Sequence, residues 1–326
     1  MKIRNTTAIF SVLIALTAFA LEANAKVPSL GGRTASSKLA TTATFGDVED
    51  YQIGDVWGKL PLTAADVNSG SAALQRAARA TARYAGFMGG ATGFYMGKFN
   101  GEHVMGTNHH VVDGVGCRGV SLIFPFLSNS SVTVKCKRII GHWTDIDFGM
   151  IVLDIPADKE SLFLNHGVNF AFERSIERGT ELLTVGFGIA KNSGQKNMMV
   201  NVDNDCKVYS ANNDFKLMGD PDTINPGPYK AWSFAHGCDI SHGDSGSAFF
   251  DRKTGEMLGI VWTAATPKDP QIRTRAYLDS LDPASPEIWS KLGYTVPAAK
   301  VYDFLKSVSS SLPKADSAIV DEILKK

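Results

Sequence analysis

The stretch His236–Phe250 reads HGCDISHGDSGSAFF, with Ser245 among small residues just before an apolar run. A serine hydroxyl is a poor nucleophile unless a base takes its proton and hydrogen-bond donors meet the oxyanion that forms. Gly243 lets the backbone turn its N–H groups toward a substrate carbonyl with no side chain in the way. The pattern therefore predicts a nucleophilic serine, for which the rest of the chain must supply a base.

Two histidines, His109 and His110, directly follow an expected strand, and Asp147 directly precedes another. Rigid strand ends can bring such side chains together in a cleft. Histidine is the best general base near neutral pH, and an aspartate on its second nitrogen fixes the tautomer. The order His, Asp, Ser differs from Ser, Asp, His in α/β-hydrolases and from Asp, His, Ser in subtilisins. Only the chymotrypsin order fits.

Over about residues 88–308 the chain resembles the chymotrypsin-fold (trypsin-like) serine peptidases, and their secreted bacterial branch in particular. Three motifs carry the resemblance: T-x-x-H at 107–110, D-x-x-x-[LI] at 147–151 and G-D-S-G at 243–246. The resemblance implies that His110 is the base, Asp147 the orienting carboxylate and Ser245 the nucleophile. It also implies an oxyanion hole formed by the N–H groups of Gly243 and Ser245. His109 and Asp145 are the rival residues, but neither keeps the motif register.

A substrate pocket is also implied by the resemblance. Asp239 stands six residues before Ser245, where trypsin-like members have the pocket floor, so a preference for Lys or Arg before the cleaved bond is expected. Arg273 and Arg275 are the cations that could instead neutralise this carboxylate. Residues Trp262, Thr263 and Ala264 resemble the family's S-W-G strand edge, which forms a pocket wall. Two further histidines, His236 and His242, either line the cleft or cap a loop.

The sequence leaves the partner of Asp244 open. In the digestive enzymes of this family, cleavage frees an amino terminus that pairs with the corresponding aspartate. The nearest basic candidate here, Arg83, lies only a short way before the strand expected at Gly93, too close to reach Asp244 in that way. Asp244 has another partner, or the surrounding loop supplies its hydrogen bonds.

Short strand patterns dominate residues 92 to 263. The expected strands are 93–97, 103–107, 119–124, 131–136 and 148–153, then, after a polar linker at 156–169, 181–188, 198–202, 206–210, 247–251 and 257–263. Asn100-Gly101 predicts a hairpin. Helices are expected at 71–84, 297–308 and 316–326. Two groups of strands indicate an all-β chain with two six-stranded-type antiparallel β-barrels, a C-terminal helix and an N-terminal helical extension.

The domain plan follows from these elements. Residues 1–25 have a basic start, an apolar core and a small-x-small site, which predict a secretory signal peptide. A propeptide or N-terminal extension is expected at 26–85 and the peptidase domain at 86–308, followed by a tail at 309–326. Within the domain, barrel one covers about 86–155, barrel two about 180–296 and the C-terminal helix 297–308.

Export to a secreted or periplasmic location makes disulfides more plausible than metal ligation for the four cysteines. They allow three pairings. The pairing of sequence neighbours, Cys117 with Cys136 and Cys206 with Cys238, is expected.

Composition narrows the function further. The formal net charge is zero and 44% of the residues are hydrophobic, which fits a folded protein without a nucleic-acid or membrane-surface partner once the signal is removed. The predicted chemistry needs no cofactor and no metal, and its partner is a protein or peptide substrate. The predicted function is a serine endopeptidase. Its alternatives are a non-catalytic binding pseudoprotease and an esterase on the same fold.

Overall fold

The computed structural model describes residues 46–86, 89–191 and 197–326. The predicted signal peptide lies outside these residues. A search of the described part of the chain for a helix long and apolar enough to cross a membrane found none.

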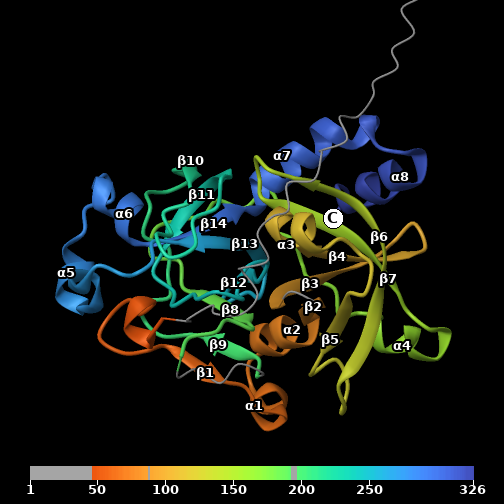
Figure 1. The fold of residues 1–326 in the computed structure, drawn as a ribbon, viewed down its shortest axis with the longest axis horizontal. Helices are drawn as coiled ribbons and strands as arrows, with labels where there is room; N and C mark the ends of the chain where they lie inside the picture. The colour runs from red at the N-terminus through yellow and green to blue at the C-terminus, as the bar shows by residue number, and fades with distance from the viewer. Residues whose placement is uncertain (1–45, 87–88, 192–196) are drawn as a thin grey trace, which may run out of the picture. The chain divides into compact units, whose positions relative to one another are not determined.

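Six strands of the first half close into an antiparallel barrel in the order β2-β3-β4-β7-β6-β5 (Figure 1). They are β2 (Thr81–Gly86), β3 (Gly89–Phe99), β4 (Glu102–Thr107), β5 (Ser121–Phe124), β6 (Val132–Trp143) and β7 (Phe148–Asp154). Asn100 and Gly101 join β3 to β4 with positive φ angles of 47° and 80°. Two consecutive positive φ angles are what a two-residue hairpin turn requires, so the hairpin prediction is confirmed.

The second half is an eight-stranded antiparallel sheet in the order β1-β9-β8-β12-β13-β14-β11-β10. Its strands are β1 (Lys59–Pro61), β8 (Leu182–Gly186), β9 (Met199–Asn201), β10 (Lys216–Gly219), β11 (Lys230–His236), β12 (Ala248–Asp251), β13 (Met257–Ala264) and β14 (Gly293–Pro297). A closed antiparallel barrel, a second antiparallel sheet and C-terminal helices confirm the predicted all-β, chymotrypsin-like fold class. The edge strand β1 comes from the predicted N-terminal extension, so the described part of that extension, from residue 46, contributes to the fold.

Eight α-helices and four short 3₁₀ turns occur in the described residues. The helices are α1 (Ala64–Ser69), α2 (Ala72–Ala80), α3 (His109–Val115), α4 (Glu160–Phe163), α5 (Arg275–Ser280), α6 (Pro286–Lys291), α7 (Ala298–Val308) and α8 (Lys314–Ile323). The 3₁₀ turns are Val48–Asp50, Ala157–Lys159, Pro270–Arg273 and Ser309–Ser311.

Two element predictions need correction. The helix expected at 71–84 starts as predicted, with the Ser71 hydroxyl accepting from the Leu74 N–H, but it ends at Ala80. Residues 81–86 instead form β2, because pairing with both β3 and β5 outweighs the helical propensity of an alanine-rich segment. Barrel one therefore begins at Thr81, before the predicted boundary at 86. The strand expected at 206–210 makes only isolated bridges at Lys207 and Val208.

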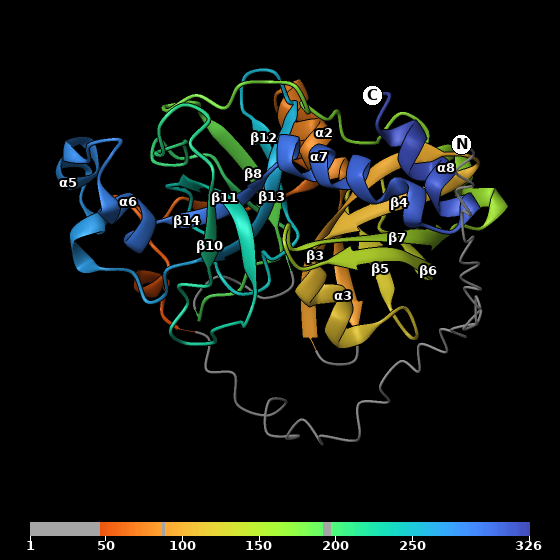
Figure 2. The same cartoon turned by 90° about the horizontal axis from the view of Figure 1, so that it is seen from above.

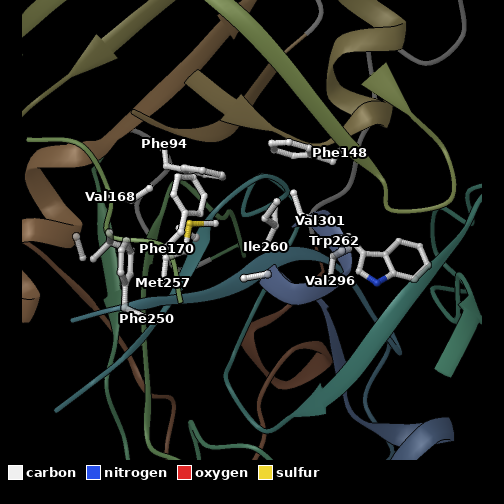
Figure 3. Close-up of a cluster of buried hydrophobic side chains, with 14 of the residues drawn as sticks. Phe94, Phe148, Val168, Phe170, Phe250, Met257, Ile260, Trp262, Val296 and Val301 are labelled. Carbon is white, nitrogen blue, oxygen red and sulfur yellow. The ribbon is translucent and has the colours of Figure 1, made fainter. Parts of the chain in front are cut away.

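One hydrophobic core joins the two halves. Figure 3 shows Phe94 and Phe148 of the barrel beside Ile260 of the second sheet and Val301 of α7, and all four side chains are buried. Helix α7 leaves the second sheet and leads to α8, which packs on β3 (Figure 2). The ring of Phe304 lies 5.8 Å from that of Trp143. The C-terminal helices thus help to hold the barrel against the sheet.

Candidate active site

The ends of two paired strands position His110 and Asp147. β4 pairs with β7 through Thr107 and Gly149, so the α3 residues after β4 lie next to the turn before β7. The fully buried Asp147 carboxylate accepts from His110 Nδ1 at 2.8 Å and from the His110 backbone N–H at 3.0 Å. Asn108 Nδ2 donates to the Asp147 carbonyl at 2.8 Å, which secures the turn. The His110 imidazole is therefore held in one orientation, with Nε2 left for other partners.

The charge of Asp147 sets the basicity of this imidazole. Burial by itself lowers the pKa of His110, but the neighbouring Asp147 carboxylate and its hydrogen bond more than offset that effect. A smaller contribution comes from the charge of Asp220. The net pKa is raised above its ordinary value, because each of these negative charges favours the imidazolium form.

The loop carrying Ser245 is fastened to both halves of the fold. Thr92 of β3 donates its backbone N–H to the Ser245 carbonyl at 2.9 Å and its hydroxyl to the Gly243 carbonyl at 2.8 Å. Gly246 donates its N–H to the Val261 carbonyl at 3.1 Å on the other side. Gly246 has a φ of +85°, and a Cβ there would lie 2.2 Å from the Thr92 carbonyl oxygen. Only glycine fits so close an approach.

Ser245 and His110 line one cavity of about 220 Å³. The predicted wall residues Trp262, Thr263 and Ala264 line it too, as do several residues that the sequence did not indicate. These are Tyr51, Asp220, Asp222, Asn225, Pro226, Gly227, Tyr229, Ile240, Ser241, Val261 and Thr266. His242, for which the sequence left open a place in the cleft or a role as a loop cap, lines the cavity as well. The structure thus brings the predicted nucleophile, base and wall to one place.

The backbone around Ser245 leaves two N–H groups free. The His242 carbonyl accepts from Ile189 N at 2.7 Å and the Asp244 carbonyl from Ser247 N at 2.8 Å. In a trans peptide the N–H points opposite to the C=O, so the amides of Gly243 and Ser245 point away from these donors. Neither amide donates to another group within the described residues. Gly243 has a φ of +100°, which a residue with a side chain rarely adopts.

Asp244 has a partner that comes from the N-terminal extension. Lys59 Nζ of β1 lies 2.5 Å from Asp244 Oδ2, and both side chains are at most 5% exposed. The same carboxylate accepts from the backbone N–H groups of Gly188 at 2.8 Å and Ser241 at 2.9 Å. The carboxylate next to Ser245 is therefore neutralised by a lysine side chain and not by an amino terminus.

Asp239, the predicted pocket floor, is not among the residues that line the cavity. The carboxylate is fully buried and accepts from the backbone N–H groups of Ile53 and Gly58, each at 2.6 Å. Burial raises the pKa of Asp239 to about 8 despite these hydrogen bonds. Arg275 does not reach it either, because Arg275 Nη1 pairs with Asp205 Oδ1 at 2.9 Å. Both backbone N–H groups that donate to Asp239 thus come from the N-terminal extension.

Two other acids line the cavity instead. Asp222 Oδ2 lies 2.7 Å from His242 Nε2, and the other ring nitrogen of His242 lies 3.1 Å from the Tyr51 hydroxyl. Asp220 accepts from the Gly227 N–H at 2.7 Å and from the Thr263 hydroxyl. The segment from 220 to 229 is a loop rich in Asp, Asn, Pro and Gly, and no catalytic motif marks it in the sequence.

The rival residues have other surroundings. His109 faces His142, with Nδ1 to Nδ1 at 2.8 Å and the two rings stacked. Burial and the neighbouring His142 lower the pKa of His109. Asp145 is exposed and its carbonyl accepts from Trp232 N. His236 is fully buried, and its Nδ1 accepts from Cys238 N at 3.1 Å, so it braces a loop.

Both predicted disulfides are present. Cys117–Cys136 ties the segment after α3 to β6, and Cys206–Cys238 ties the loop before Ser245 to the segment after β9. The second bridge lies close to the predicted nucleophile along the chain and limits the movement of its loop.

The closed barrel, the second antiparallel sheet and the C-terminal helices form a chymotrypsin-like fold. No protein-family model matches the chain. No curated protein matches it either.

Several solved structures are similar to the chain at low identity. An inactive form of Rv3671c from Mycobacterium tuberculosis matches with a TM-score of 0.48 and 17% identity, over 80% of this chain and 98% of that one. Deg5 matches with a TM-score of 0.47 and 14% identity, over 74% and 93%. A scabies mite inactivated protease paralogue matches with a TM-score of 0.46 and 12% identity, over 79% and 99%.

Proposed function

We propose that the chain is a serine endopeptidase in which Ser245 is the nucleophile, His110 the general base and Asp147 the orienting carboxylate. One observation carries the proposal: the imidazole of His110, fixed through Nδ1 by a buried carboxylate, lines the same cavity as Ser245. A base with one nitrogen fixed has the other free to take a hydroxyl proton.

In the proposed reaction, Ser245 Oγ attacks the substrate carbonyl carbon while its proton passes to His110 Nε2. The free N–H groups of Gly243 and Ser245 stabilise the oxyanion. His110 then gives the proton to the leaving amine, the C–N bond breaks and an acyl-enzyme remains. Water, deprotonated by His110, cleaves the ester in the same way and releases the acid. Each proton in this sequence is carried by His110, so the proposed reaction requires neither a metal nor an organic cofactor.

The experiment that tests this proposal uses one acyl group on two leaving groups. Fluorogenic peptide amides and the matching esters are incubated with the protein, and a fluorophosphonate label reports whether a serine is activated. Cleavage of amides together with labelling that Ser245→Ala abolishes is the expected result. Cleavage of esters alone would favour the esterase, and the absence of labelling and of all hydrolysis would favour a non-catalytic pseudoprotease.

We also propose that the cavity prefers Lys or Arg before the cleaved bond, with Asp220 as the attracting charge. Asp222 is already paired with His242, whereas no lysine or arginine of the described residues lies within ion-pair distance of Asp220. A substrate cation would supply that missing partner. Asp220→Asn should lower kcat/KM for an arginine substrate about tenfold relative to an alanine substrate. An unchanged ratio would contradict the assignment.

The proposed location is extracellular or periplasmic. Two disulfides persist in oxidising compartments and are rare in a reducing cytosol. We propose that the predicted signal peptide, residues 1–25, is removed and that the extension is kept at least from Lys59 onward. The intact mass of the exported protein tests both points, and a mature form that starts after Lys59 would contradict the second.

A further inference from the structure

Three side chains beside the predicted catalytic base take no part in the proposed peptidase chemistry. His109 and Asp113 are four residues apart on α3, so they lie on the same face of one helical turn. His142 comes from β6, on which α3 packs. Metal sites in proteins often take two ligands from positions i and i+4 of a helix and a third ligand from a neighbouring strand.

The distances suit a small cation. His109 Nδ1 and His142 Nδ1 are 2.8 Å apart, and His142 Nδ1 is 3.9 Å from Asp113 Oδ1. One ligand atom from each of the three residues lies within 4.8 Å of the others. Ring nitrogens aimed at each other repel unless a proton or a cation lies between them. Two imidazole nitrogens and a carboxylate oxygen form a donor set that zinc and similar ions accept.

The surroundings of the three residues allow an ion to enter from solvent and hold the Asp113 carboxylate in one orientation. His109 is buried, whereas a third of the His142 side chain and half of the Asp113 side chain are exposed, so an ion can arrive from solvent. The Tyr229 hydroxyl donates to the other carboxylate oxygen, Asp113 Oδ2, at 3.1 Å. The ring of Tyr229 also meets that of His109 edge-on at 4.8 Å. Such outer hydrogen bonds hold metal ligands in place.

We propose that His109, Asp113 and His142 form a binding site for a divalent transition-metal ion of the zinc class, separate from the residues proposed for hydrolysis. Three protein ligands leave one position of a tetrahedral ion for water. Tyr229 also lines the cavity that contains His110 and Ser245, so the site touches one wall of the cavity. Metal binding itself does not depend on the proposed peptidase activity.

Zinc binding is measured by isothermal titration on the full chain carrying Ser245→Ala, which avoids autolysis. One ion per chain is expected. His142→Ala and Asp113→Asn should each weaken binding at least about tenfold, as loss of groups in the ligand sphere does. His166→Ala, which removes a histidine from a loop outside the site, should bind as the parent does. Cobalt(II) absorption in the visible range, present in the parent and lost in His142→Ala, would report nitrogen ligation directly.

Two imidazole–carboxylate pairs whose histidines line the cavity provide the discriminating controls. These are the His110–Asp147 pair and the His242–Asp222 pair. His110→Ala and His242→Ala should retain the titrated ion. Binding that survives in both His142→Ala and Asp113→Asn, or that disappears in His110→Ala alone, would overturn the proposal. Thermal melting in the presence of chelator shows whether each variant folds. If His142→Ala fails to fold, the titration of Asp113→Asn, whose side chain is half exposed in the parent, tests the proposed site.

Discussion

Lys59 Nζ lies 2.5 Å from Asp244 Oδ2, and this ion pair is almost completely buried beside the predicted nucleophile. The ammonium also donates to Ser241 Oγ at 3.1 Å. Asp244 in turn accepts from Gly188 N and Ser241 N, so the ion pair holds the two segments that flank the Ser245 loop. The N-terminal extension thus supplies a cation to the site through the side chain of Lys59.

Lys59→Met should abolish the proposed peptidase activity and destabilise the fold. Removing one partner of a buried pair leaves an uncompensated charge, which costs about 3–5 kcal/mol. The free energy of unfolding and the fraction of protein labelled by a fluorophosphonate measure the two effects. Lys98→Met is the matched control, because the ion pair of Lys98 with Glu160 is exposed and such pairs contribute at most about 1 kcal/mol. Equal behaviour of the two variants would show that the buried pair is unimportant.

The roles of the adjacent histidines can be separated by mutation. His110→Ala and Ser245→Ala should each reduce kcat by about 10⁶-fold, because members of a triad act as a unit. His109→Ala should cost far less, since its ring faces His142 and not Asp147. Turnover of a peptide amide is measured in a buffer with chelator. A loss with His109→Ala as large as that with His110→Ala would contradict the assignment of the base.

The acid limb of the activity profile should lie above pH 6.5, the ordinary pKa of histidine. The base must be neutral to accept a proton, and the raised pKa of His110 keeps it protonated to higher pH. Activity is therefore lost as pH falls through this raised value. Asp220→Asn removes one of the negative charges that favour the imidazolium form, so it should move the limb to lower pH. The dependence of kcat/KM on pH, measured in a buffer with chelator, gives the position of the acid limb in the parent and in Asp220→Asn. A limb that moves to higher pH in the variant would contradict this electrostatic account.

Asp239→Ala should destabilise the protein without changing substrate preference. The substitution leaves the N–H groups of Ile53 and Gly58 without acceptors, at about 1–3 kcal/mol for each buried donor. Denaturant unfolding measures the loss, and exposed Asp158→Ala is the control. The ratio of kcat/KM for arginine and alanine substrates should stay at the parent value. A collapse of that ratio would restore Asp239 as a substrate contact.

The sequence motifs were sufficient to predict contacts between residues that lie at the ends of paired strands. The T-x-x-H and D-x-x-x-[LI] motifs stand at the ends of paired strands, and so His110 and Asp147 are indeed in contact. Asp239 shows where spacing fails. Its distance from Ser245 along the chain is that of a pocket floor, yet the extension fills the space with Ile53 and Gly58. Only the tertiary position of a segment far upstream in the chain decides this.

Strand β1 was missed for the same reason. Three residues, Lys59–Pro61, carry no period-2 signal, and β1 exists because it pairs with β9. The loop from 220 to 229 likewise has no motif, and its acids reach the cavity only through tertiary packing. β2 illustrates the opposite effect, since an alanine-rich helical pattern continues through residues that barrel closure requires to be extended.

Thr92 links the first barrel to the second half of the molecule through three hydrogen bonds. This one residue of the first barrel binds the Gly243 and Ser245 carbonyls, and its hydroxyl accepts from Phe187 N in the second half. Separation of the two halves would break these hydrogen bonds and release the Ser245 loop from the barrel that carries His110. In the proposed peptidase, the alignment of Ser245 with His110 therefore depends on how the two halves are docked.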